Sequence, residues 1–244
     1  MNTQNMILAL ALGLAAASGN VLGGFFVVRK NWSQEFLKYF VALGAGFMLG
    51  IVFLDIVPES AQMIGISRSL AWVLVGYFIV HFFEHTLAPH FHFGEEIHGP
   101  ELHHHSGFSA LAGLMIHTFF DGVAIGSGFL VSAWLGWVIS AAIFVHKLPE
   151  GFAVASLMIA TGQGRRRALL SSVALGAATL IGIVFMIVLR TEIRYALPLA
   201  GGVTMYVAAS DLIPEVNREP KPGMALLVFC GLAVVFALHR IFGA

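Results

Sequence analysis

The hydropathy pattern divides the chain into long apolar stretches separated by short polar breaks. A helix needs about 20 mostly apolar residues to cross the hydrocarbon core of a bilayer. Eight stretches meet this length, with approximate bounds of roughly 5–28, 38–62, 69–88, 107–131, 134–160, 168–190, 194–216 and 223–242. The pattern predicts an all-α integral membrane protein with eight transmembrane helices.

The breaks leave no room for a separate soluble domain, so residues 1–244 are expected to form one transmembrane domain. The first apolar stretch has no basic leader in Met1–Asn5 and is predicted to be a retained helix rather than a signal peptide. The break at 89–106 is rich in histidine and is expected to bind metal, although a flexible polar loop without fixed geometry has the same composition.

Composition narrows the class of protein. Hydrophobic residues make up 58% of the chain and charged residues 11%, against about 45–50% and about 25% in soluble domains. The formal net charge is zero, which argues against nucleic acid as a partner. Since Cys230 is the only cysteine, any metal site must use histidines and carboxylates.

The distribution of basic residues predicts how the chain is oriented in the membrane. Eight Lys and Arg residues fall on one side of the predicted membrane and four on the other. Short loops rich in Lys and Arg stay cytoplasmic. We therefore expect both termini outside, the loop 89–106 inside and, without an obvious targeting sequence, a bacterial cytoplasmic membrane.

Two phrases in the sequence occur twice. Leu54–Glu59 reads LDIVPE, and Ser210–Glu215 reads SDLIPE. These copies end the second and seventh stretches, which cross in opposite directions, as in an inverted repeat. His117–Gly122 pairs in the same way with His146–Gly151. A 3+2+3 arrangement of helices is predicted; the alternative is that apolar helices simply resemble one another.

The second pair of phrases carries candidate ligands. Residues i and i+4 share one face of a helix, so His117 with Asp121, and His146 with Glu150, each present an imidazole and a carboxylate together. Two imidazoles and two carboxylates suit Zn²⁺, and would accept Fe²⁺, Mn²⁺, Co²⁺ or Cd²⁺. The alternative is that these groups bond to one another as structural polar contacts.

On these motifs the chain resembles the ZIP family of divalent metal transporters. The likeness includes the eight stretches, the His-rich loop, the His-x-x-x-acid-Gly and His-x-x-Pro-Glu phrases and the two Asp-x-x-Pro-Glu endings. The resemblance implies a mid-membrane metal site at His117, Asp121, His146 and Glu150, and net movement of metal toward the cytoplasm.

Two positions depart from the family pattern. Thr118 stands where the family commonly has Asn and is a weaker oxygen ligand. Lys147 stands where relatives with paired metals have an acidic or amide ligand, and a protonated lysine cannot coordinate. We expect one metal ion, with the Lys147 ammonium beside Asp121 and Glu150 in place of a second cation. If Lys147 instead snorkels away, a second weak site could survive.

Other polar residues are assigned to the metal pathway. Asp55, Glu59, Asp211 and Glu215 are expected to guide ions, or else to be solvated at helix ends broken by the prolines. His81, Glu84 and His85 would hand metal to the loop or face the headgroups. Met48 could complete the coordination shell, but a methionine in a membrane helix usually packs.

The sequence therefore favours a metal transporter with no prosthetic group, the metal ion being its substrate and the bilayer its surroundings. An intramembrane zinc hydrolase, with Glu150 activating a bound water, is the alternative; the chain lacks a His-Glu-x-x-His helix, and an enzyme needs no inverted repeat. A passive channel would differ from a carrier in rate and gating. The oligomeric state, a homodimer included, stays open.

Overall fold

The computed structural model describes residues 3–29, 34–86, 104–217 and 221–242, and helices make up nearly all of them. The α-helices are α1 Thr3–Arg29, α2 Gln34–Ile51, α3 Val57–Ile64, α4 Ile66–Thr86, α5 His104–Val131, α6 Ala133–Ala160, α7 Arg165–Val188, α8 Ile193–Tyr206, α9 Ile213–Asn217 and α10 Pro222–Phe242. Three short segments connect some of them: the π-helical η1 Val52–Ile56 and η3 Val207–Leu212, and the 3₁₀-helical η2 Arg190–Glu192.

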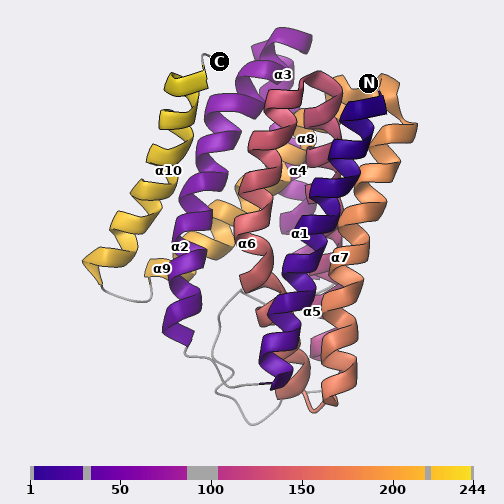
Figure 1. Ribbon diagram of the computed structural model, residues 1–244, viewed down its shortest axis with the longest axis vertical. Helices are drawn as coiled ribbons and strands as arrows, with labels where there is room; N and C mark the ends of the chain where they lie inside the picture. Colours follow the sequence, from indigo (N-terminus) through magenta and orange to yellow (C-terminus); the bar gives the residue numbers. More distant parts are fainter. Residues whose placement is uncertain (1–2, 30–33, 87–103, 218–220, 243–244) are drawn as a thin grey trace.

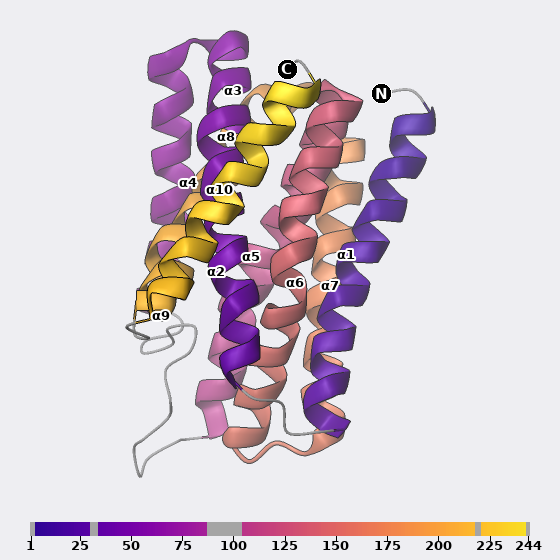
Figure 2. The same ribbon diagram turned by 60° about the vertical axis from the view of Figure 1, so that its left-hand side comes forward.

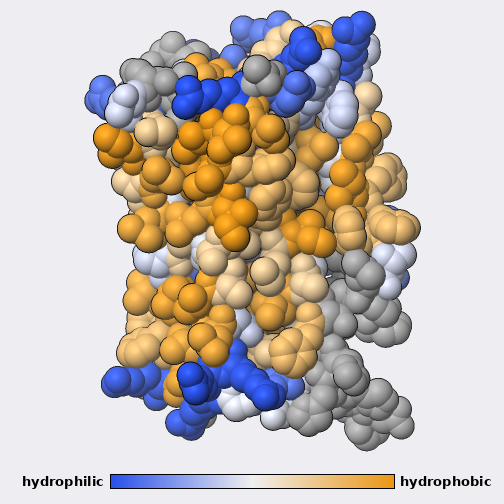
Figure 3. All heavy atoms as spheres, turned by 90° about the vertical axis from the view of Figure 1, so that its right-hand side faces the viewer, coloured by the Kyte–Doolittle hydropathy of each residue, from blue (hydrophilic) through white to orange (hydrophobic). Residues whose placement is uncertain are grey.

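The prediction of an all-helical membrane protein is confirmed. Within the described residues, six helical segments are long and apolar enough to cross a membrane. The remaining two predicted stretches correspond to α8–η3–α9, which is not among these six, and to α10, whose apolar part Pro222–Leu238 is shorter. Figure 3 shows the expected surface, with a broad apolar band between hydrophilic residues at both ends.

The helices form a bundle with a central group and two flanking pairs. The long helices α1, α5, α6 and α7 run side by side, and α1 packs on α6 and α7 while α5 packs on the same two helices (Figures 1 and 2). Outside them, α2 packs on α10 and on α6, and α8 packs on α4 and on α5. Helices α5 and α6 thus lie at the centre of the packing scheme.

Glycines let the central helices approach until backbones touch. A Cβ at Gly23 of α1 would lie 2.2 Å from the Leu148 carbonyl oxygen of α6. A Cβ at Gly182 of α7 would lie 2.1 Å from the Phe119 carbonyl oxygen of α5. Leu148 and Phe119 occupy matching places in the two His-containing phrases, so the two contacts correspond.

The helices of the two flanking pairs also approach closely at glycines. A Cβ at Gly46 of α2 would lie 1.9 Å from the Val228 carbonyl oxygen of α10, and one at Gly202 of α8 would lie 1.9 Å from the Val73 carbonyl oxygen of α4. Close backbone approach of this kind is the usual reason for small residues at membrane helix interfaces.

The two Asp-x-x-Pro-Glu phrases do not break their helices, contrary to one sequence-based expectation. A proline lacks the donor to the fourth residue before it, and its ring crowds that carbonyl. Here a π-helical turn, η1 before Pro58 and η3 before Pro214, opens the helix so that it continues past the proline. Asp55 and Asp211, within these turns, are 6% and 8% exposed, so the alternative that they are solvated is wrong.

We predict that Gly23→Val and Gly182→Val each destabilise the bundle by about 1–3 kcal/mol, because the added side chain must push a neighbouring backbone away. Thermal unfolding of the purified protein in detergent checks this. Gly223→Ala is the control, since a Cβ there meets nothing within 4 Å; equal Tm values for all four proteins would contradict the packing described.

Candidate metal site

The four predicted ligands come together in the middle of α5 and α6. His117 and Asp121 lie one helical turn apart on α5, and His146 and Glu150 lie one turn apart on α6. All four side chains are buried, and one ligand atom from each lies within 4.8 Å of all the others. The faces predicted from the i, i+4 spacing therefore meet.

The spacing of these atoms is close to that of a metal site. Zinc bonds of about 2.0–2.2 Å in a tetrahedron place the ligand atoms about 3.4 Å apart. The observed limit of 4.8 Å needs only a modest inward movement of side chains. Carboxylates and imidazoles in this arrangement could replace most of the water around a divalent ion.

One oxygen is at the centre of the polar contacts. Asp121 Oδ2 lies 3.2 Å from His117 Nε2, 3.3 Å from His146 Nε2 and 2.6 Å from Lys147 Nζ. The Lys147 ammonium also donates to Glu150 Oε2 at 2.6 Å. A single cation therefore bridges the two carboxylates.

Lys147 is completely buried, so the alternative that it snorkels toward the membrane surface is wrong. Its position beside Asp121 and Glu150 is the one expected from the sequence. With neutral imidazoles, two carboxylates and one ammonium leave a net charge of −1. Burying two carboxylates without a cation would cost far more, because charge is poorly solvated at this depth.

The remaining polar atoms of the cluster differ in their hydrogen bonds. The Thr118 hydroxyl donates to Glu150 Oε1 and so holds that carboxylate in place. His146 Nδ1 lies 3.2 Å from the Ala142 carbonyl oxygen, which as an acceptor fixes the proton on Nδ1 and leaves Nε2 for a ligand role. His117 Nδ1 has no hydrogen-bond partner within the described part of the chain.

A small cavity of about 20 Å³ adjoins the cluster, enough for about one water molecule or ion. It is lined by residues of four elements: Val41, Gly113, Leu114, His117, His146, Pro149, Glu150, Val207, Asp211 and Leu212. Gly113 and Leu114 precede His117 on α5, so the cavity extends toward the end of the bundle where α5 begins. The structure thus brings Asp211 to the same cavity as three of the four ligands.

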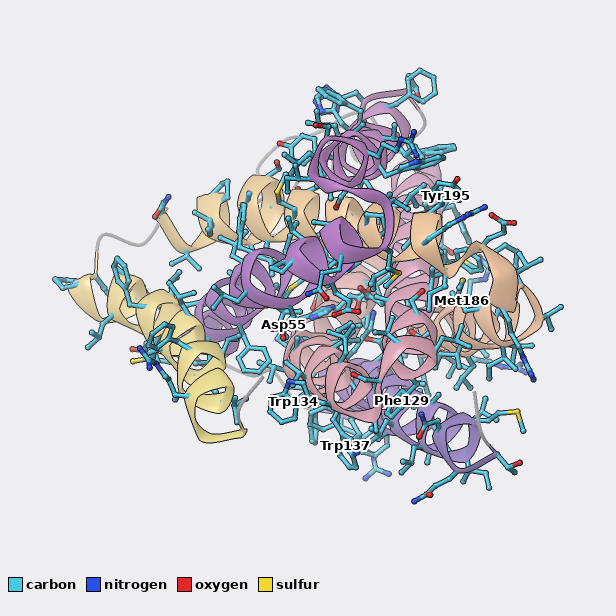
Figure 4. All side chains as sticks on the ribbon, turned by 90° about the horizontal axis from the view of Figure 1, so that it is seen from above. Asp55, Phe129, Trp134, Trp137, Met186 and Tyr195 are labelled. Atoms are coloured by element: carbon cyan, nitrogen blue, oxygen red, sulfur yellow. The ribbon has the colours of Figure 1, made fainter. Side chains whose placement is uncertain are left out.

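Between the cluster and the end of the bundle where α1 begins and α10 ends, the interior is largely apolar. Ile125 and Phe129 follow Asp121 along α5, and Ile139 and Ile143 precede His146 along α6; all four are buried. Seen from this end in Figure 4, Asp55, Phe129 and Met186 lie on different elements around the interior.

Within the described residues, the cluster of candidate ligands consists of these four alone, and the other residues predicted for the pathway are not part of it. Met48 is fully buried in an apolar cluster with Val203 and Tyr206, as expected for packing. The His81 and His85 rings stack with centroids 4.1 Å apart, and Glu59 is partly exposed. The side chains of Glu84 and Glu215, and residues 87–103 of the His-rich loop, lie outside the described residues.

The sequence analysis missed Asn20 of α1. This side chain is fully buried, and neither of its amide atoms has a hydrogen-bond partner among residues 3–29, 34–86, 104–217 and 221–242. The available signal was an amide in the middle of an otherwise apolar stretch, where polar side chains are costly.

These features define a class of protein, the polytopic helical membrane proteins with a buried cluster of histidines and carboxylates. Residues 103–239, more than half of the chain, match the model of the family described as "ZIP Zinc transporter". The chain belongs to this family of metal transporters.

Several curated relatives are similar to the chain at low identity. Zinc transporter ZIP13 of Pongo abelii is 27% identical over 238 residues, which cover 88% of this chain and 70% of that protein. Zinc transporter foi of Drosophila melanogaster is 29% identical over 121 residues, or 48% of this chain and 17% of that protein. Metal cation symporter ZIP14 of Bos taurus is 28% identical over 120 residues, or 47% and 24%.

We predict that Thr118→Val, which keeps the shape of the side chain but removes its donor to Glu150, lowers the free energy of unfolding by about 1.5–3 kcal/mol. Thr118→Ser keeps a hydroxyl and should lose much less. Thermal unfolding in detergent with EDTA measures both; a Thr118→Val protein as stable as Thr118→Ser would show that the hydrogen bond contributes little.

Proposed function

We propose that this protein carries divalent metal ions, zinc foremost, across the membrane toward the cytoplasm by alternating access. The observation that carries the proposal is the buried set of His117, Asp121, His146 and Glu150, four ligands from two adjacent helices within 4.8 Å of one another. Such a set has little purpose in an apolar bundle unless it replaces the water around an ion. Family membership supports the same conclusion.

The proposed scaffold is a single domain of residues 1–244 with eight membrane helices in a 3+2+3 inverted repeat. The glycine contacts support it: α1 on α6 corresponds to α7 on α5, and α2 on α10 to α8 on α4. The π-helical turns η1 and η3 correspond in the same way. Repeats of this kind let one group of helices move against another around a central site.

The chemistry of the four ligands limits which metal ions can be the substrate. Two imidazoles and two carboxylates suit Zn²⁺ and would also hold Cd²⁺, Fe²⁺, Mn²⁺ or Co²⁺. The metal is substrate rather than cofactor, and we expect one ion per chain because Lys147, next to His146, cannot coordinate a second ion while protonated. The bilayer is the expected surrounding, and a homodimer stays a prediction.

The proposed direction rests on the cavity and on charge. The cavity leads from the cluster toward the end that carries Arg165, Arg166 and Arg167, which the positive-inside rule places in the cytoplasm. Asp211 lies on this route, and Asp55 is its counterpart in the other half of the repeat. Both ends of the chain would then be outside, which agrees with their common side in Figure 1. A bacterial cytoplasmic membrane stays a prediction, since the three relatives named above are animal proteins.

The alternative, a zinc hydrolase, would need Glu150 free to activate water. In this structure Glu150 accepts hydrogen bonds from Lys147 and Thr118, which occupy one oxygen each. Glu150 is also one of the four proposed ligands, and a carboxylate that binds the metal and accepts a hydrogen bond from Thr118 is a poor general base. The same four residues therefore fit a transporter better than a zinc hydrolase.

We expect purified protein in liposomes to accumulate labelled zinc, and His117→Ala or Glu150→Ala to lower the rate by at least about tenfold, since each removes a ligand. Cadmium, manganese and iron as competitors rank the selectivity. Glu192→Gln, at an exposed carboxylate, is the control and should keep the native rate. Stoichiometric zinc binding without any uptake would reject the carrier and favour the hydrolase.

Asp211→Asn should lower the uptake rate by about tenfold, because an ion leaving the cluster through the cavity loses about 1.4 kcal/mol of attraction at its next carboxylate. Zinc binding at equilibrium should change much less than the rate. Uptake kinetics and calorimetry on the same preparations separate these quantities; an unchanged uptake rate would remove Asp211 from the pathway.

A further inference from the structure

Lys147 and a bound metal ion cannot keep the same contacts. The ammonium lies 2.6 Å from oxygens of both Asp121 and Glu150, the two carboxylates of the proposed site. An ion bonded to both carboxylates would lie within about 5 Å of Nζ, where two positive charges repel strongly in a buried site. If the proposed function holds, Lys147 must therefore withdraw when metal binds.

A withdrawn ammonium still needs a hydrogen-bond acceptor, because Lys147 is completely buried. The stretch of α1 around Asn20 packs on this part of α6: a Cβ at Gly19 would lie 3.1 Å from Lys147 Cβ, and one at Gly151 would lie 2.0 Å from the Asn20 carbonyl oxygen. Asn20 is fully buried, and its amide oxygen has no donor among the described residues.

The repeat supports pairing these two residues. Thr118 is the counterpart of Lys147 in the two His-containing phrases. Thr179 is the counterpart of Asn20, because a Cβ at Gly122 would lie 2.0 Å from the Thr179 carbonyl oxygen, as one at Gly151 would lie 2.0 Å from that of Asn20. One half of the repeat thus has two threonines, and the other half has a cation and an amide. The two departures from symmetry occur together.

We propose that Lys147 is a displaceable internal cation: it neutralises Asp121 and Glu150 in the metal-free carrier, and the side-chain oxygen of Asn20 accepts its ammonium when metal takes the carboxylates. The arrangement keeps a compensating positive charge at the carboxylates in both states. It also weakens metal binding, since the ion must displace an existing ion pair, and weaker binding favours release.

The experiment measures zinc binding by titration calorimetry on purified full-length protein in detergent. Asn20→Leu removes the acceptor at similar volume and should weaken zinc binding about tenfold. Lys147→Met removes the competing cation and should tighten it about tenfold or more. In the double variant, Asn20→Leu should have no further effect, because no ammonium remains to be accepted.

Controls separate this proposal from the proposed function. Ser18→Ala changes an exposed residue of α1, whose hydroxyl bonds within its own helix, and should bind zinc like the native protein. Tight zinc binding by the double variant, equal to that of Lys147→Met, shows that a protein carrying Asn20→Leu is not merely misfolded. Suppose that native protein binds zinc, and that Asn20→Leu either leaves this binding unchanged or weakens it equally with and without Lys147. Either result overturns the Lys147–Asn20 proposal alone. Absence of zinc binding by native protein overturns the proposed function.

Discussion

The cost of burying charge governs this structure. Asp121 and Glu150 lie at the centre of an apolar bundle, where two unneutralised carboxylates would be strongly unfavourable. A positive charge must therefore be present whenever both are ionised. In the structure that charge is the Lys147 ammonium, which contacts both carboxylates at once. The rest of the fold holds these groups together and excludes water from them.

Close backbone packing is what makes the cluster compact. Helices α5 and α6 present their predicted ligands toward each other. Glycines let α1 pack closely on α6, and α7 on α5. A Cβ at Gly23 or Gly182 would lie 2.2 or 2.1 Å from a carbonyl oxygen of the neighbouring helix, so a side chain there would push these backbones apart. Since the glycines also fix helix positions relative to one another, the scaffold and the site depend on the same contacts.

Much of this was predictable because the bilayer imposes simple rules. Hydropathy located the helices, and the i, i+4 spacing of His117 with Asp121 and of His146 with Glu150 placed the predicted ligands on one face of each helix. The contact of Lys147 with both acids also followed from its position one residue after His146. These features depend on local periodicity and on elementary charge pairing.

Features that depend on contacts between distant helices were not predictable. The prolines at 58 and 214 indicated interrupted helices, but only the three-dimensional structure shows that π-helical turns carry the chain past them. Asn20 was missed because the part of α6 on which its stretch of α1 packs is far away in sequence. Likewise, nothing in the sequence alone brings Asp211 to the cavity beside His117.

If the proposed inverted repeat and alternating access hold, the departures from symmetry explain how one scaffold can serve two states. An inverted repeat gives the two access states similar energies because each half can adopt the conformation of the other. Perfect symmetry at the site would place threonine at both positions beside the carboxylates, and the metal-free site would then hold two uncompensated charges. One lysine, in one half, is sufficient to neutralise most of that charge, and a second lysine would repel the metal ion. The asymmetry between Lys147 and Thr118 therefore lies where charge balance requires it, while the close glycine contacts are paired.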